Sequence, residues 1–228
     1  MANFDLQKTA QLEQLFRTPR EQRDANWVAA FYAAAPDASL KTGEQQLIRG
    51  PDGFPYLALY LPAPNEKFNA FCISEVATNC LEHGAGCVIS PNQSTPEWVF
   101  TYGNLWSLHS YNSFDATPPA SEQKPAMGAG RRVLIASPSE SFFPALARNV
   151  IRSFLTNAGV KNPSVLLISD SSSTPAESLA FSVYPEEFPS REAFDDVMSR
   201  LKNWFLPPHY GLIALPRSSE YESYFVPL

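Results

Sequence analysis

The stretch Gly86-Cys87-Val88-Ile89-Ser90-Pro91 is a short apolar run that begins at a glycine and ends before a proline. The same order of residue classes returns in Gly211-Leu212-Ile213-Ala214-Leu215-Pro216. Short apolar runs with these boundaries are typical of buried strands. Apolar residues at helical spacing precede each run, over residues 68–82 and 190–204. Each stretch therefore predicts a helix that leads into a buried strand.

The elements expected upstream of these two runs also follow one order. After a first helix over 5–17, we expect a helix over 21–35 and strands over 46–49 and 54–61, and in the second half a helix over 144–158 and strands over 164–169 and 177–184. We predict an α+β fold of two similar helix-strand-strand-helix-strand modules, a pseudo-duplication with mixed sheets covered by helices. An apolar sheet face needs such a second layer. A chance likeness of two ordinary α+β layouts is the alternative.

The segment 112–130 separates the two halves and differs from them in composition. It contains three prolines, two glycines and few residues that could enter a core. This composition is typical of a linker or a long surface loop. The expected organisation is an N-terminal α+β module with an aromatic hairpin over 1–111, a Pro-rich linker over 112–130 and a C-terminal α+β module over 131–228.

The bulk composition excludes several classes of protein. Of the 228 residues, 44% are hydrophobic and 18% are charged, with a net charge of −6. An intrinsically disordered chain would combine low hydrophobicity with a higher charge. The densest basic clusters are the pair Arg131-Arg132 and a group of three arginines interleaved with acidic residues: Arg17, Arg20 and Arg23 with Glu13, Glu21 and Asp24. Neither forms a basic stripe with interleaved aromatic residues, so we predict no nucleic-acid partner.

The expected location is the cytoplasm. No run approaches the ~18 apolar residues that a membrane-spanning helix needs, and the first eight residues lack a basic stretch followed by an apolar one. The three cysteines, Cys72, Cys80 and Cys87, are an odd number. In reducing compartments most cysteines are small buried hydrophobic residues. The cysteines therefore fit the cytoplasm, and the lack of a long apolar run predicts no association with a membrane.

Cys80, His83 and Cys87 are the best candidates for a metal or thiolate site. Cys80 and His83 lie near the end of a predicted helix and Cys87 lies in the strand that follows, so the three could approach one point. A structural zinc site needs four ligands, and Cys72 lies two helical turns away from Cys80, about 12 Å on ideal geometry. The alternative interpretation is a pair of core cysteines beside a helix-terminal histidine.

Other motifs of known chemistry are absent or lie in the wrong context. The chain has no Gly-x-Ser-x-Gly stretch, the turn that exposes the serine of strand-turn-helix hydrolases. Ser121-Glu122-Gln123-Lys124 matches the Ser-x-x-Lys pattern of serine nucleophiles, but it lies in the expected linker, where no helix orients the lysine toward the serine. Gly128-Ala129-Gly130 precedes a strand, whereas phosphate-binding loops follow a strand and open a helix. The pairs Glu186-Glu187 and Asp195-Asp196 are assigned to helix starts, where the macrodipole favours acidic residues. These observations favour a non-catalytic protein without a cofactor.

The most suggestive feature is an aromatic hairpin expected over 97–111, with Gly103-Asn104 as its two-residue turn. Strand alternation places three aromatic side chains on one face and Val99 with Thr101 on the other. Either the protein covers both apolar faces itself, or one face binds a partner. The candidate partner-binding residues are Trp98, Phe100, Tyr102 and Tyr111. The segment 220–228 alternates similarly and is a candidate edge strand.

Several stretches together resemble the enhanced serine sensitivity protein B family. In the first half they are Leu12-Glu13-Gln14-Leu15 with Pro19, Arg23 and Phe31. In the second half they are Ser137-Pro138-Ser139-Glu140 after a strand, a helix over 144–158, and strands over 165–168 and 179–183. The likeness covers most of the chain, although the aromatic hairpin has no counterpart in the family. It implies a bacterial cytoplasmic protein with a non-enzymatic role, and it assigns no catalytic residue.

Two functional hypotheses follow from different classes of protein. The first is a cytoplasmic, non-catalytic protein that binds a protein partner or associates with itself, through the aromatic hairpin, a sheet edge or both. The alternative is an enzyme or small-molecule sensor with a pocket between the two modules, in which Cys80, His83 and Cys87 or His109 supply the chemistry. A rigid scaffold without either activity is a third interpretation.

Overall fold

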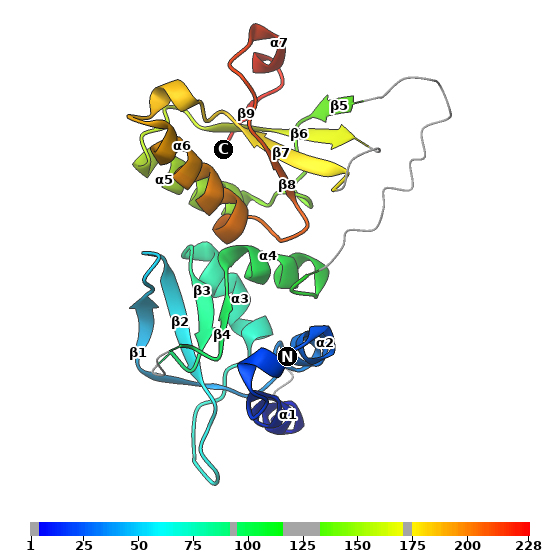
Figure 1. Ribbon diagram of the computed structural model, residues 1–228, viewed down its shortest axis with the longest axis vertical. Coiled ribbons are helices and arrows are strands. Elements are labelled where there is room, and N and C mark those ends of the chain that lie inside the picture. The colour runs from blue at the N-terminus through cyan, green and yellow to red at the C-terminus, as the bar shows by residue number, and fades with distance from the viewer. Residues whose placement is uncertain (1–4, 92–94, 116–132, 171–174) are drawn as a thin grey trace, which may run out of the picture. The chain divides into compact units, whose positions relative to one another are not determined.

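The computed structural model describes residues 5–91, 95–115, 133–170 and 175–228. The chain divides into two compact units, unit 1 up to Phe114 and unit 2 from Asp115 (Figure 1). Each unit has a mixed sheet with helices packed on it, which confirms the α+β class. The expected linker over 112–130 falls largely outside the described residues, and its character stays a prediction.

Unit 1 contains a four-stranded sheet in the order β1-β2-β3-β4. The pairs β1/β2 and β3/β4 are antiparallel and β2/β3 is parallel. The elements along the chain are α1 (Leu6–Phe16), a 3₁₀ turn (Arg20–Gln22), α2 (Ala25–Ala34), β1 (Lys41–Arg49), β2 (Pro55–Tyr60), α3 (Ile73–Glu82), β3 (Gly86–Ile89), β4 (Trp98–Phe100) and α4 (Tyr102–Tyr111).

Aspartates set the starts of the first two helices. The Asp5 carboxylate accepts hydrogen bonds from the backbone N–H groups of Gln7 and Lys8, at 2.8 and 3.2 Å. Asp24 caps α2 in the same way through the N–H of Trp27, at 2.8 Å. An N-cap residue lies outside the helix it caps, so α2 begins at Ala25, and not at residue 21 as the periodicity predicted.

Unit 2 contains a sheet in the order β5-β6-β7-β8, and β9 also pairs with β6. The pair β7/β8 is parallel and the other pairs are antiparallel. The elements are β5 (Val133–Ala136), α5 (Ala145–Asn157), β6 (Ser164–Asp170), β7 (Glu177–Phe181), a 3₁₀ turn (Pro185–Glu187), α6 (Arg191–Arg200) with a π-helical extension (Leu201–Phe205), β8 (Gly211–Ile213), α7 (Ser219–Glu222) and β9 (Val226–Pro227).

The two predicted repeats share the same strand pairings. In unit 1 an antiparallel pair, β1/β2, is extended by the parallel strand β3, and in unit 2 the pair β6/β7 is extended by β8. Gly86 lies opposite Tyr56, and Gly211 lies opposite Ser178. A Cβ atom at Gly211 would clash with Ser178 Oγ, so β8 needs a glycine there. The pairings agree with two similar modules, and the pseudo-duplication itself stays a prediction.

The predicted aromatic hairpin is wrong in its second half, because residues 102–111 form the helix α4. Thr101 and Asn104 form a capping box, in which the Asn104 N–H donates to Thr101 Oγ1 at 3.2 Å and the Thr101 N–H donates to Asn104 Oδ1 at 3.0 Å. The supposed turn Gly103-Asn104 is therefore the first turn of a helix. Only Trp98–Phe100 remains as a strand.

Removing this cap is expected to weaken α4. Replacing Thr101 with alanine leaves the Asn104 N–H without its acceptor, and loss of an N-cap costs about 1 kcal/mol. The free energy of unfolding from urea titration would measure the change. Thr101→Ser keeps the hydroxyl group and serves as the control. Equal stability of the alanine and serine variants would show that the cap contributes nothing.

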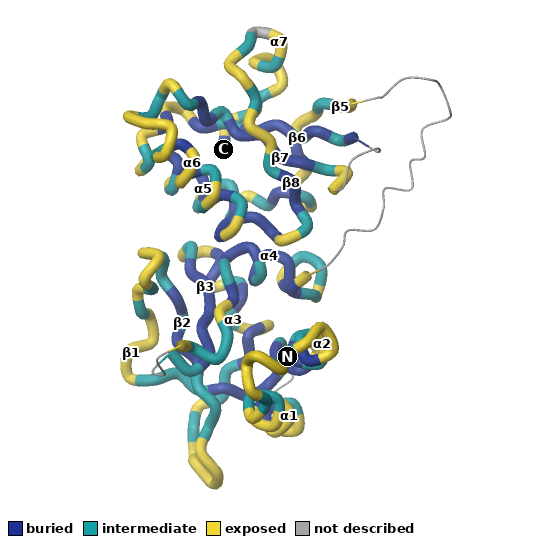
Figure 2. Tube along the Cα trace, in the orientation of Figure 1, coloured by how far each residue is buried: buried dark blue, intermediate teal, exposed yellow. Residues whose placement is uncertain are grey.

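The core of each unit lies between its sheet and its helices. All four residues of β3 are buried, and so are four of the five residues of β7. Figure 2 shows these central strands in dark blue, with exposed residues concentrated on outer helix faces and connections. The predicted edge strand over 220–228 is mostly wrong, since α7 occupies its start and only Val226–Pro227 is a strand, already paired with β6.

Candidate functional site

The aromatic face of β4 packs against α2 of the same unit. The ring centroid of Phe31 lies 4.6 Å from that of Trp98 and 5.7 Å from that of Phe100. Phe100 also stacks on Phe114, with centroids 4.3 Å apart. The protein itself therefore covers most of this face, while Trp98 stays half-buried. On the opposite face of β4, Val99 remains 39% exposed.

The four candidate partner-binding residues have different environments. Phe100 and Tyr102 are completely buried, and burial raises the pKa of the Tyr102 hydroxyl. Trp98 and Tyr111 are half-buried. The Trp98 ring meets Tyr32 of α2 edge-on, with centroids 5.8 Å apart, and Tyr32 is half-buried too. Among these residues, Trp98 and Tyr32 thus form one surface where aromatic groups reach solvent.

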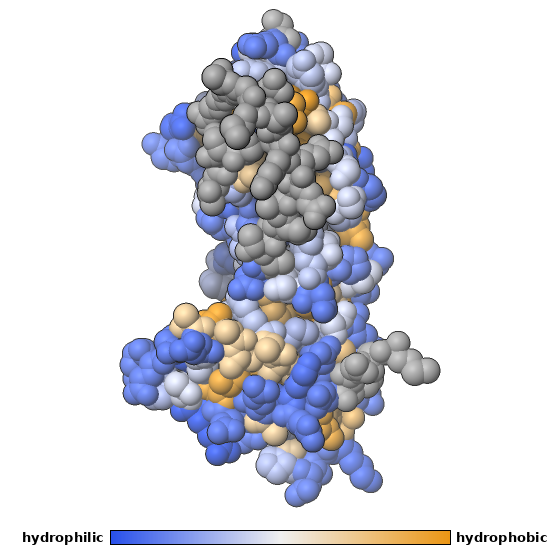
Figure 3. Space-filling model, turned by 90° about the vertical axis from the view of Figure 1, so that its right-hand side faces the viewer, coloured by the Kyte–Doolittle hydropathy of each residue, from blue (hydrophilic) through white to orange (hydrophobic). Residues whose placement is uncertain are grey.

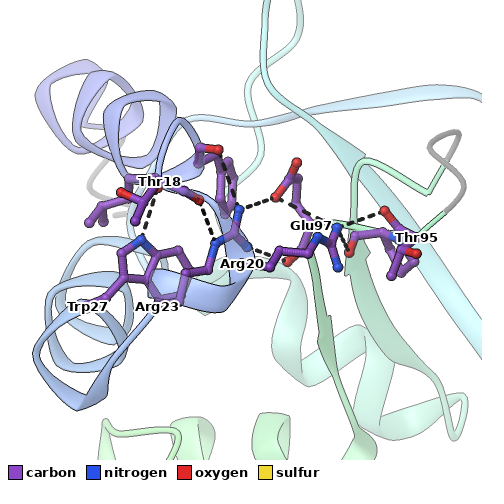
Figure 4. Close-up of polar contacts among 9 residues, drawn as sticks. Thr18, Arg20, Arg23, Trp27, Thr95 and Glu97 are labelled. Carbon is purple, nitrogen blue, oxygen red and sulfur yellow. Dashed lines mark hydrogen bonds and ion pairs between the residues drawn. The ribbon is translucent and has the colours of Figure 1, made fainter.

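A buried ion pair anchors the start of β4 to the connection between α1 and α2 (Figure 4). Arg23 Nη2 lies 2.8 Å from Glu97 Oε2, and the two side chains are only 9% and 13% exposed. The Arg23 guanidinium also donates to the carbonyl oxygens of Thr18 and Phe16 and lies 4.6 Å from the ring centroid of Trp27. From the sequence, Arg23 belonged to a basic cluster interleaved with acidic residues, and this ion pair was not predicted.

The neighbouring arginines also have partners within unit 1. Arg20 donates to the carbonyl oxygens of Thr95 and Pro96, at 2.9 and 2.7 Å (Figure 4). Arg17 forms an exposed ion pair with Glu13 at 2.9 Å. Arg20 and Arg23 therefore tie the α1–α2 connection to the segment that leads into β4, whereas Arg17 pairs only with α1.

Cys80 and Cys87 come together as predicted, whereas His83 does not join them. The two Sγ atoms are 3.7 Å apart in the core. His83 is exposed and its Nδ1 contacts the Asn79 carbonyl oxygen at 2.8 Å. Cys72 lies at the other end of α3, with its Sγ 3.4 Å from Ser74 Oγ. Within the described residues, no group of three or more His, Cys, Asp or Glu side chains could hold a metal ion.

The remaining candidates are dispersed. His109 Nδ1 contacts Thr78 Oγ1 at 3.3 Å on an exposed surface. The assignment of Asp195-Asp196 to a helix start is wrong, since both lie inside α6 and pair with arginines one turn away, Arg191 and Arg200. Glu186 and Glu187 do lie at the start of a 3₁₀ turn, where both pair with Arg217. The motifs at 121–124 and 128–130 lie outside the described residues.

Among the described residues, five strands have only one paired neighbour, and they differ in how they are protected: β1, β4, β5, β8 and the two-residue strand β9. β1 carries charged residues and a register irregularity between Thr42 and Leu47, and β4 and β8 are only three residues long. Charges, bulges and shortness are the usual devices that prevent a sheet edge from pairing with another chain. β5 has the sequence Val-Leu-Ile-Ala, without a charge, a proline or a described irregularity.

The β5 edge is also the most exposed apolar strand. Leu134 is 64% exposed and Val133 is 46% exposed. The register Leu134↔Ser169 and Ile135↔Ile168 places one row of β5 backbone groups toward β6 and the other row away from it. No other strand among the described residues pairs with that outer row. Sequence reasoning predicted this strand but not that it is an edge, because a run of four apolar residues is typical of a central strand.

The side that carries α2 in Figure 1 is seen face-on in Figure 3, where hydrophobic groups gather at the level of this helix. Ala29 and Ala33 of α2 are exposed. No helix among the described residues is long and apolar enough to cross a membrane.

The chain matches no family model, no curated protein and no solved structure.

Proposed function

We propose that the protein is a non-catalytic cytoplasmic protein that binds a protein partner, which adds an extended segment to the edge of β5. The observation that carries this proposal is the exposure of two large apolar side chains on a strand whose outer backbone row has no described partner. Addition of a strand to such an edge is a common mode of peptide recognition, in which backbone hydrogen bonds supply affinity and alternate side chains supply specificity.

The chemistry of β5 suggests what the partner segment contains. Val133 and Ile135 share one face of the sheet, and Ile135 packs on the buried cluster of Leu166, Ile168 and Ala180. Leu134 and Ala136 lie on the opposite face, and both are exposed. Apolar side chains of the added segment would therefore pack beside Leu134, while its backbone pairs with β5. An extended, uncharged segment rich in β-branched residues fits this surface.

Replacing Leu134 with lysine is expected to reduce capture of the partner from native lysate by at least tenfold. A charge beside the added strand would lose its hydration on binding without gaining a partner. Leu6→Lys is a matched control, since Leu6 is 65% exposed on α1 in unit 1 and Leu134 is 64% exposed. Quantitative mass spectrometry of the captured proteins measures the effect. Equal capture by both variants and the wild type would refute the β5 proposal.

The half-buried pair Trp98 and Tyr32 is the second candidate binding surface. Tryptophan and tyrosine are enriched among residues that dominate binding energies, and the apolar face of α2 with Ala29 and Ala33 lies on the same helix as Tyr32. If Trp98→Ser loses the partner while remaining folded and Leu134→Lys retains it, the interface lies on unit 1. Sedimentation of the wild type and of Leu134→Lys tests for self-association. A dimeric wild type beside a monomeric variant would identify a second copy of the chain as the partner.

Membership of the enhanced serine sensitivity protein B family remains part of this proposal. Its support is the likeness of the sequence stretches, and what it implies is a bacterial cytoplasmic protein with a non-enzymatic role. The alternative, an enzyme or sensor with a pocket between the two modules, also stays a prediction. Within unit 1, the separation of His83 from the Cys80–Cys87 pair gives that alternative no assembled set of reactive groups.

A further inference from the structure

Two of the three cysteines are in direct contact with each other. Cys80 lies in the last turn of α3 and Cys87 is the second residue of β3. The connection between them reverses direction at Gly84, whose φ of +65° is a left-handed conformation that suits glycine. This turn brings the two Sγ atoms to 3.7 Å, and both thiols are free. The local chain path thus holds the two thiols together independently of the β5 edge.

We propose that Cys80 and Cys87 form an oxidative modification site, at which a small peroxide converts the two thiols into an intramolecular disulfide. The two sulfur atoms are already at van der Waals distance, 3.7 Å, and would approach to about 2.05 Å in the disulfide. Cys72 has a separate environment at the start of α3, where it contacts Ser74. This inference goes beyond the proposed binding function and does not depend on it.

Cys80 is the thiol that reacts first. It retains 3% exposure, whereas Cys72 and Cys87 have none. The two thiols share a hydrogen bond in which either sulfur can be the donor, and this bond lowers the pKa of Cys80 while it raises that of Cys87. Thiolates are the reactive form of cysteine. The same geometry therefore favours a thiolate at the one cysteine of the pair that a small oxidant can reach.

The reaction balances with hydrogen peroxide as the oxidant. The Cys80 thiolate attacks one peroxide oxygen, the O–O bond breaks, and hydroxide leaves and takes up the proton released by Cys80 to form water. Cys80 is then a sulfenic acid. The Cys87 sulfur attacks the Cys80 sulfur, the S–O bond breaks, and the departing hydroxide takes the Cys87 proton as a second water. The peroxide is reduced by two electrons, and the two thiols are oxidised to one disulfide.

The new bond would fasten the end of α3 to the centre of the unit 1 sheet. Cys87 lies opposite Phe100 in the β3/β4 register and opposite Leu57 in the β2/β3 register. Phe100 stacks on Phe31 of α2. The disulfide would therefore join α3 covalently to the strand that neighbours the aromatic cluster.

Peptide mapping of the folded wild-type protein tests this inference without any substitution. After treatment with hydrogen peroxide and alkylation of the remaining thiols, digestion with an endoprotease that cuts after glutamate separates the three cysteines, because Glu75 and Glu82 lie between them. The expected product is a peptide pair joined through Cys80 and Cys87, two hydrogens lighter than the reduced pair, with Cys72 alkylated. Glutathione oxidised in the same tube confirms that the peroxide is active.

Two variants sharpen the result. Cys72→Ala is expected to leave formation of the disulfide unchanged. Cys87→Ala removes the second thiol, so Cys80 is expected to stop at the sulfenic acid, which a 1,3-dione traps. A bond that involves Cys72, a disulfide between two chains, or three unmodified thiols beside oxidised glutathione would each overturn the inference.

Discussion

Replacing Arg23 with alanine is expected to destabilise unit 1 by about 3–5 kcal/mol, because it leaves the buried Glu97 carboxylate with only the more distant guanidinium of Arg20, at 4.0 Å. Glu97 is only 13% exposed and its closest cation is the Arg23 guanidinium, 2.8 Å away. The substitution also removes hydrogen bonds to two carbonyl oxygens of the α1–α2 connection, those of Phe16 and Thr18. The free energy of unfolding from urea titration measures the effect.

The control for this prediction is another arginine of the same cluster. Arg17 and Glu13 also form an ion pair, but their side chains are 75% and 56% exposed. Pairs of this kind contribute about 0–1 kcal/mol, so Arg17→Ala is expected to be nearly neutral. In addition, Arg23→Met combined with Glu97→Gln removes both charges and is expected to recover part of the lost stability. If Arg23→Ala and Arg17→Ala were equally mild, the buried pair would not anchor β4.

Replacing Phe31 with alanine is expected to cost a similar ~3–5 kcal/mol, because it opens a cavity in a core that packs tightly. Phe31 has no exposed surface. Its ring lies within contact range of five other rings, those of Phe16, Trp27, Tyr32, Trp98 and Phe100. The substitution therefore removes the centre of the cluster that joins α2 to β4.

Thermal unfolding followed by tryptophan fluorescence is a suitable measurement for Phe31→Ala, because Trp27 and Trp98 both contact the deleted ring. The matched control is Leu6→Ala, since Leu6 is 65% exposed and exposed substitutions change stability by less than about 0.5 kcal/mol. A loss below about 1 kcal/mol for Phe31→Ala would mean that the ring cluster packs too loosely to hold α2 on the sheet.

Local patterns predicted most of the helices and strands. The apolar runs at Gly86 and Gly211 are β3 and β8, and each follows a helix as expected. The error at 102–111 arose because Trp98-Val99-Phe100-Thr101-Tyr102 alternates like a strand. The strand itself ends before Thr101, whose side chain caps α4. A threonine followed three residues later by asparagine was the available signal for that helix start.

The candidate site depended on contacts that a single sequence does not contain. The approach of Cys80 to Cys87 could be predicted, because a helix end, a turn and a strand lie within eight residues of one another. The coverage of Trp98 and Phe100 by α2 could not, since residue 31 and residue 98 are distant in sequence. The identity of β5 as an edge likewise depends on the order of strands in the sheet.

The central place of β6 in its sheet bears on how the chain folds during synthesis. Every strand of unit 1 is synthesised before β5. In unit 2, β6 pairs with β9 through Val165 and Val226, which come from opposite parts of that unit. Contacts between residues so distant in sequence form late. We expect unit 1 to fold first, while the end of β6 that pairs with β9 keeps that side unpaired until β9 emerges.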